Sequence, residues 1–235
     1  MLNAVMLFGK QETTLTTDIA HYYKLDGDST DAYASLDGTT ESVSYNSSYG
    51  VINEGINLNG ASNFIKLGQT TTAVFDSTTT ARSYAAWIYP TGSQYGNIFA
   101  TTHEGEVYFQ VFPGSGAVRG RFLANISGSY EVIYTTVNAF PLNTWAHFVG
   151  VFDLPNQTWT LYKNGAYNNG GSMTGSTVSN TNLSTRIGAN VQGTPGEFFK
   201  GYIDELGLWN KALTLSEVQE LYWAGIGNQY PFTQG

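Results

Sequence analysis

Carboxylates at two distant places in the chain give the clearest chemical signal in the sequence. The first, Asp204, lies in the run FFKGYIDELGLW at residues 198–209. If this run is a strand, its side chains alternate between two faces. One face holds Tyr202, Asp204, Leu206 and Leu208, and the other holds Ile203, Glu205 and Trp209. Burying a carboxylate among apolar groups is costly without a counter-charge, and no Lys or Arg follows Lys200 in the run. Asp204 therefore predicts a nearby cation, unless it accepts backbone N–H groups instead.

The second group is the acidic segment DGDSTD at residues 26–31. Asp26, Asp28 and Asp31 can supply oxygen ligands to the same cation if the fold brings this segment beside Asp204. The alternative is a polar turn in which the Asp side chains bond to their own backbone. The sequence leaves both interpretations open.

Catalytic chemistry has weaker support. In the segment HEGE at residues 103–106, Glu104 and Glu106 would share a strand face, and a carboxylate pair beside a histidine can do acid–base work. The pattern is more typical of a solvated turn. His147 falls in an alternating apolar run, which favours a core position. The chain has no cysteine and no Gly-x-Ser-x-Gly motif. We therefore expect no enzymatic activity.

Composition narrows the class of partner. The 235 residues can form one sizeable core, and 41% of them are hydrophobic. The net charge of −8 argues against a nucleic-acid partner, and no run approaches the ~18 apolar residues that insertion into a membrane needs. Residues 2–9 are apolar, but Lys10 follows them and no cleavage site of a secretory signal is evident. We expect a soluble chain that reaches a virion or extracellular surface without a Sec signal.

Short alternating runs separated by Gly, Asn, Ser and Thr predict an all-β fold. The expected strands are 19–25, 51–58, 62–67, 82–89, 96–101, 106–112, 117–124, 129–136, 144–153, 157–163, 184–189 and 198–209. Pro155-Asn156 and Asn164-Gly165 are expected at turns, the first inside a hairpin. Residues 1–17 read as an N-terminal arm that docks on its own domain or on a partner, and residues 18–235 as one domain.

One helix is expected near the C-terminus. Thr214 and Glu217 are expected to form a capping box at its start, and Gly225 is expected to end it. The apolar stripe of the helix consists of Leu215, Val218, Leu221 and Tyr222.

Several motifs together resemble the laminin G-like, concanavalin A-like jelly-roll superfamily, in its bacterial and phage branch, from about residue 19 to residue 225. They are YKLDGD (23–28), GINLNG (55–60), YAAWIYP (84–90), NTWAHFV (143–149), LYKNG (161–165), and GYIDEL (201–206) continuing through WNKAL (209–213). The resemblance implies two antiparallel sheets packed as a jelly-roll sandwich with one short C-terminal helix. It also implies a structural Ca²⁺ that ties the first loop to the last long strand, with Asp26, Asp28, Asp31 and Asp204 as ligands.

In such a fold, ligands meet the loops at one rim or the concave sheet face. Sugar recognition calls for aromatic platforms and a few fixed polar groups, and the candidates in turn-rich segments are Tyr45, Tyr49, Tyr95, Tyr130 and Tyr167. We therefore predict a non-catalytic, lectin-like adhesion module for a surface glycan or polysaccharide, displayed on a phage virion. The alternative is a capsid decoration or tail protein that uses the jelly roll as a scaffold and the arm to contact other virion proteins. A hydrolase ranks third.

Overall fold

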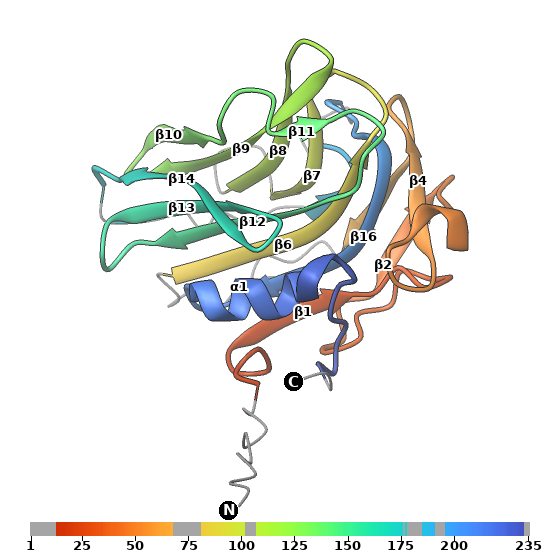
Figure 1. Cartoon of the computed structure of the whole chain (residues 1–235), viewed down its shortest axis with the longest axis horizontal. Coiled ribbons are helices and arrows are strands. Elements are labelled where there is room, and N and C mark those ends of the chain that lie inside the picture. Colours follow the sequence, from red (N-terminus) through yellow and green to blue (C-terminus); the bar gives the residue numbers. More distant parts are fainter. Residues whose placement is uncertain are drawn as a thin grey trace, which may run out of the picture.

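Two antiparallel sheets stack face to face in the computed structural model (Figure 1), which describes residues 13–67, 81–101, 107–175, 177, 185–190 and 196–232. We call the first sheet A. Its strands, in order across the sheet, are β14 (Ala166–Ser172), β13 (Thr158–Lys163), β12 (Ala146–Asp153), β6 (Ala81–Pro90), β16 (Lys200–Trp209), β4 (Gly55–Asn59) and β3 (Ser44–Asn46), while β1 (Ile19–Tyr23) also pairs with β16.

The second sheet, sheet B, contains β10 (Ser129–Tyr134), β9 (Ala117–Ile126), β8 (Val107–Pro113), β7 (Gly96–Thr101), β15 (Thr185–Ile187), β5 (Phe64–Leu67) and β2 (Gly38–Glu41), with β11 (Phe140–Pro141) paired to β9. Strands that are neighbours in a sheet are often distant in the chain, as β6 and β16 are. The two-layer antiparallel architecture confirms the jelly-roll prediction.

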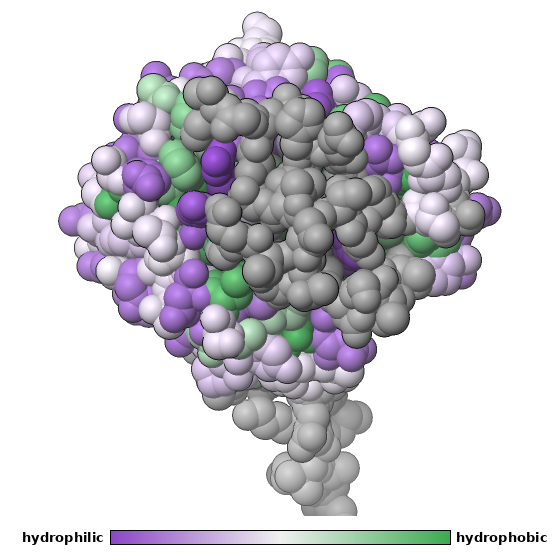
Figure 2. Space-filling model, turned by 180° about the vertical axis from the view of Figure 1, so that it is seen from behind, coloured by the Kyte–Doolittle hydropathy of each residue, from purple (hydrophilic) through white to green (hydrophobic). Residues whose placement is uncertain are grey.

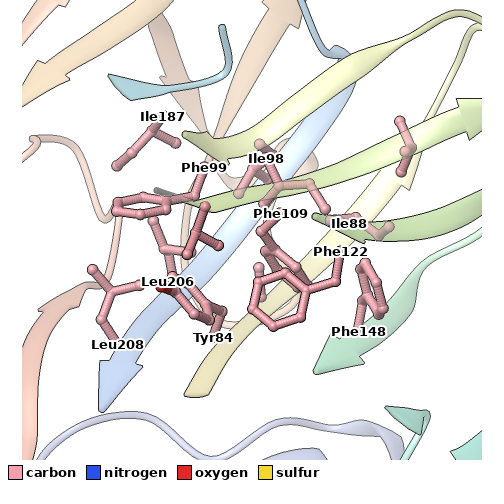
Figure 3. Packing of buried hydrophobic residues seen from close by; sticks show 14 of the residues in the cluster. Tyr84, Ile88, Ile98, Phe99, Phe109, Phe122, Phe148, Ile187, Leu206 and Leu208 are labelled. Carbon is pink, nitrogen blue, oxygen red and sulfur yellow. The ribbon is translucent and has the colours of Figure 1, made fainter. Parts of the chain in front are cut away.

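The core forms where alternate side chains of both sheets point inward. Figure 3 shows rings and aliphatic groups from the two sheets pointing toward one another. Phe109 of sheet B stacks on Phe148 of sheet A with ring centroids 4.4 Å apart, and Tyr84 lies 5.0 Å from Phe122. Burial of such rings, about 1.5–3 kcal/mol for each side chain, holds the layers together.

A second apolar layer covers the outer face of sheet A. Helix α1 (Leu215–Tyr222) packs Val218 and Leu221 into a cluster with Trp209 and residues of β12, and it crosses in front of this sheet in Figure 1. The capping box of Thr214 and Glu217 is confirmed.

The ends of the predicted apolar stripe and of the helix differ from the sequence prediction. Leu215 is 45% exposed and does not join the buried layer. The left-handed residue that ends the helix is Trp223, with φ 42°, and not Gly225. Gly225 instead closes a following 3-10 turn, η2 (Trp223–Gly225).

Most strands lie where the alternation predicts them, including the β12–β13 hairpin and the turn at Asn164-Gly165. Residues 51–54 are a loop and not the start of β4. The prediction omits four strands, namely β2, β3, β11 and β14. These strands are short or polar, so they carry little alternating signal.

The described end of the predicted arm docks on its own domain. Leu15 is fully buried, and its carbonyl accepts the indole N–H of Trp209 at 2.7 Å. Thr14 donates its hydroxyl to Glu217 at 2.6 Å. Residues 1–12, the rest of the arm, lie outside the described residues.

Candidate functional site

Strand β16 changes its neighbour halfway along one edge. It pairs with β4 over residues 200–203 and with β1 over residues 206–209, while β6 lies along the other edge. Asp204 and Glu205 fall between the two pairings. The register against β6 shifts here, and Glu205 has a left-handed φ of 51°. This edge of β16 thus has no strand partner at Asp204 and Glu205, and the loops after β1 and before β4 lie against it.

This irregularity overturns the predicted faces of the strand. Leu206 and Leu208 pack in the core between the sheets together with Ile203. A bulge in one strand reverses the alternation beyond it. Asp204 therefore does not lie among Leu206 and Leu208, as the sequence predicts, but lies against the loop of residues 51–54.

Asp204 is fully buried there. Its Oδ2 accepts the backbone N–H groups of Val51 at 2.7 Å and Ile52 at 3.0 Å, whereas its Oδ1 is buried and accepts no hydrogen bond. Burial raises the pKa of Asp204 to about 8 against the effect of these amides, and the charge of Asp26 raises it further. The alternative reading, acceptance of backbone N–H groups, holds for one oxygen, and the other oxygen stays without a partner.

Asp204 belongs to a group of three acids, Asp26, Asp204 and Glu205, which we call the carboxylate cluster. The amide nitrogen of Gln229 donates to Glu205 Oε1 at 2.6 Å and to Asp26 Oδ2 at 2.8 Å. Tyr22 donates its hydroxyl to Glu205 Oε2 at 2.7 Å. Burial and the charge of Asp204 raise the pKa of Glu205 well above its usual value. Neither ion pair formed among the described residues includes a member of the cluster.

The chemistry of the cluster suits a hard cation. Carboxylate oxygens are the ligands that Ca²⁺ prefers, and an unpartnered buried oxygen is a costly feature that a cation would relieve. Among the described residues, however, no three acidic or histidine side chains converge as a metal site needs. Backbone carbonyls, the Gln229 side-chain oxygen or water would have to complete any coordination shell around Asp26 and Asp204.

A groove of about 420 Å³ opens beside the cluster. It is lined by Lys24, by residues 51–53 and by residues 226–231. The groove thus borders the loop whose amides bond to Asp204. Lys24 places one positive charge at its wall.

The other two predicted ligands are engaged elsewhere. Asp28 is exposed, and its Oδ1 accepts the N–H of Thr30 at 2.9 Å, as in a polar turn. Asp31 is buried and bonds to Nδ1 of His21 and to four backbone amides. Although burial acts to raise it, these hydrogen bonds lower the pKa of Asp31. Of the four predicted ligands, the fold brings Asp26 and Asp204 together.

A separate pocket of about 200 Å³ lies on sheet B, on the side away from the core, and we call it the sheet-B pocket. It is lined by Tyr108, Gln110, Arg121, Leu123, Tyr130, Asn190 and Glu197. Gln110 is buried, and its amide nitrogen donates to Asn97 at 2.6 Å and to Glu197 at 3.0 Å. The pocket thus combines two tyrosine rings with polar groups held in place.

One of the predicted ligand-binding tyrosines lines this pocket, and a second lies near one of its lining residues. Tyr130 lines it and is 52% exposed. Tyr95 is 40% exposed and lies beside it, with its ring 5.8 Å from the guanidinium of Arg121. Tyr45 packs half-buried against the core, and Tyr49 stacks on a tyrosine of β16 at 4.6 Å. Tyr45 and Tyr49 do not line the pocket.

The remaining candidates from the sequence do not lie at the sheet-B pocket or lie outside the described residues. Residues 103–106 lie outside the described residues. His147 is buried, and burial lowers its pKa to about 3. Tyr167 is 62% exposed on β14 of sheet A, away from the sheet-B pocket. No helix within the described ranges is long and apolar enough to span a membrane.

Sequence reasoning missed most of the residues that line the pocket. Along β9, Arg119 and Arg121 alternate with the core residues Val118 and Phe122. That alternation is a signal that both arginines face away from the core. Figure 2 shows the molecule from behind, and its coloured residues are mostly hydrophilic with separated hydrophobic spots.

Solved structures show the same architecture. Domain 4 of AbnA, a GH43 extracellular arabinanase from Geobacillus stearothermophilus solved in complex with arabinotriose, matches with a TM-score of 0.67 and 22% identity, over 86% of this chain and 97% of that chain. The binding domain of botulinum neurotoxin DC in complex with SialylT matches at 0.68 with 11% identity, over 90% and 52%. The binding domain of Paraclostridial Mosquitocidal Protein 1 matches at 0.65 with 15% identity, over 87% and 52%.

The chain therefore spans about half the length of the two toxin chains, and the likeness to all three structures concerns the fold. A comparison with curated protein sequences gives no match. The family model Laminin_G_3 matches residues 59–219, which is more than half of the chain and includes the strands that form most of the core. The chain belongs to this family of the concanavalin A-like lectin/glucanases superfamily.

Proposed function

We propose that this protein is a non-catalytic carbohydrate-binding module and that the sheet-B pocket is its binding site. The observation that carries the proposal is the exposed ring of Tyr130 beside the fixed polar groups of Gln110 and Glu197. An aromatic ring covers the apolar face of a sugar, and amides and carboxylates bond its hydroxyl groups. The arabinotriose complex of the AbnA domain, which has the same fold, supports the class of ligand.

The lining of the pocket favours binding over hydrolysis. Glycosidases place two carboxyl groups about 5–9.5 Å apart across the scissile bond. Among the described residues that line the pocket, Glu197 is the one carboxylate, and it already accepts hydrogen bonds from two side-chain amides. A single, restrained carboxylate is suited to hold a hydroxyl group.

We further propose that Ca²⁺ binds at the carboxylate cluster with Asp26 and Asp204 as ligands. Support comes from the unpartnered Oδ1 of Asp204 and from three neighbouring carboxyl groups whose negative charges, when ionised, disfavour one another. When bound, the ion neutralises these charges and joins the loop after β1 to the middle of β16. Its role would be structural, because the sheet-B pocket lies on the other sheet.

We propose display on a phage virion surface as the setting, with contacts to other virion proteins through the N-terminal arm. The alternative is a capsid decoration or tail protein for which sugar binding is incidental. Glycan binding distinguishes the two, because the adhesion module must bind a glycan through the sheet-B pocket and the scaffold need not. What favours the adhesion module is the sheet-B pocket itself.

A glycan array probed with the full chain tests the proposal, once with Ca²⁺ and once with a chelator. We expect binding that Tyr130→Ala reduces at least about 10-fold, because stacking on an exposed ring supplies much of the affinity. Tyr167→Ala is the matched control, since the Tyr167 ring is also more than half exposed but lies on sheet A. Absence of any glycan binding, or an equal loss in both variants, would reject the proposal and leave the scaffold alternative.

A further inference from the structure

Arg121 is the charged group of the sheet-B pocket whose charge is not compensated. It forms no ion pair and no hydrogen bond with the described residues, and its Nε is buried. Its neighbours are rings, with Tyr95 at 5.8 Å and Phe112 at 6.0 Å from the guanidinium carbon. A partly buried guanidinium without an acceptor is costly, and an anionic ligand would supply the acceptor.

We propose that the sheet-B pocket binds an acidic saccharide, with Arg121 holding the carboxylate of the sugar. This inference rests on the proposed function and adds the class of sugar. A planar guanidinium donates two parallel N–H groups to a carboxylate, which gives both strength and orientation. The flanking rings of Tyr95 and Phe112 attract the guanidinium through cation–π contacts.

The other charged groups around the pocket leave this role to Arg121. Glu197 is held by the amides of Gln110 and Asn97 and forms no ion pair with Arg121. Arg186 donates to the carbonyl of Asn190 at 2.7 Å and lies near Glu41. Arg121 is therefore the basic side chain of the pocket that lacks an acceptor.

Arg119, on the same face of β9, provides a contrast. Its guanidinium covers the ring of Tyr134 at 3.9 Å, and it does not line the pocket. The two arginines thus carry the same charge on one strand, and only the position of Arg121 allows contact with a sugar in the pocket.

The remaining lining groups match the rest of a sugar. Gln110 Oε1 is buried and has no hydrogen-bond partner, so it can accept a hydroxyl. Tyr108 and Tyr130 offer rings to the C–H face. The volume of about 200 Å³ is below the 300–1,000 Å³ of sites for drug-sized ligands, so the pocket admits a single sugar residue. We expect the acidic residue to be at the end of a glycan or in an exposed branch.

The net charge of −8 makes binding of an acidic saccharide a demanding test of the proposal. The overall field of the protein repels anions, so binding of an acidic sugar requires a local positive contact. Non-specific attraction of anions to the protein cannot produce the same result.

The experiment is isothermal titration calorimetry of the full chain with oligosaccharides that contain glucuronic or galacturonic acid, and with the same oligosaccharides after reduction of the carboxyl groups. We expect the acidic forms to bind at least about 10-fold more tightly, as a charge-assisted hydrogen bond predicts. Arg121→Gln should abolish this preference, so that the acidic and reduced forms bind the variant with equal affinity. Arg119→Gln, the matched control, should change the preference less than about 3-fold.

Several outcomes would overturn the inference. Equal binding of the acidic and reduced forms, or equal loss of preference in both arginine variants, rejects it while the carbohydrate-binding function stands. Preference for sulfated over carboxylated oligosaccharides rejects the carboxylate specificity. If Tyr130→Ala leaves all binding intact, the pocket is not the site and the proposed function also fails. Melting curves of the variants show that each is folded.

Discussion

Asp204 accepts the backbone N–H of Val51 at 2.7 Å, and this bond fastens the loop before β4 to the middle of β16. The contact exists because β16 has no strand partner at this point of its edge. The loop occupies the gap between β1 and β4 and leaves its amides facing a carboxylate. Asp204 thus holds the loop at the point where β1 and β4 meet along the same edge of β16.

Replacing Asp204 with Ala should therefore lower the melting temperature markedly. The loss leaves two part-buried amides without their acceptor, at up to about 1–3 kcal/mol each. If Asp204 also binds Ca²⁺, the variant should lose most of the increase in melting temperature that the ion gives the native protein, since a ligand that binds only the folded state stabilises it. Thermal unfolding with Ca²⁺ and with a chelator measures both effects.

Asp28→Ala is the control for that experiment, because Asp28 is exposed and bonds locally. We expect it to melt as the native protein does and to keep the response to Ca²⁺. A native-like response of Asp204→Ala to Ca²⁺ would exclude Asp204 as a ligand, even if the variant melts earlier.

The stacked pair of Phe109 and Phe148 joins the two sheets. Phe109→Ala should reduce the free energy of unfolding by about 3–5 kcal/mol, because it removes a fully buried ring and leaves a cavity. Urea denaturation measures the change. Val132→Ala on β10, where the side chain is 44% exposed, should cost less than about 0.5 kcal/mol. Similar losses in the two variants would contradict the assignment of the core.

The cap of α1 contributes a smaller, local effect. The hydroxyl of Thr214 accepts the N–H of Glu217 at 3.3 Å, and the Glu217 side chain accepts the N–H of Thr214 at 2.8 Å. Thr214→Ala should cost about 1 kcal/mol, measured by chemical denaturation. Ser216→Ala in the same turn is exposed and lies outside the box, so it should be close to neutral. An equally neutral Thr214→Ala would show that the cap does not limit stability.

Local patterns in the sequence predicted the elements whose causes are local. The capping box of Thr214 and the turn at Asn164-Gly165 each depend on adjacent residues, and both are confirmed. Strand β14 was missed because AYNNGGS has no apolar alternation and depends on pairing with β13.

The candidate sites depend on long-range pairing and were predicted only in part. Asp26 and Asp204 were expected together, and they do meet near Gln229. The bulge at Glu205 was not foreseen, because it arises from the change of partner strand and not from residues 198–209 alone. Arg121 was missed for a related reason, since its importance follows from the residues that neighbouring strands place around it.

His147 makes stability depend on pH. It is fully buried between Trp87 and Tyr222, and burial lowers its pKa from 6.5 to about 3. Below pH 6.5 the unfolded chain binds a proton at this residue and the folded chain does not. The contribution of His147 to stability is therefore complete above pH 6.5 and decreases as the pH falls toward 3, by about 1.4 kcal/mol for each pH unit.

Urea denaturation at pH 7 and pH 5 should give a difference of about 2 kcal/mol from His147. His147→Leu removes this titration. As the pH falls from 7 to 5, the free energy of unfolding of the variant should therefore rise by about 2 kcal/mol relative to that of the native protein. Parallel pH profiles would mean that His147 becomes protonated in the folded protein.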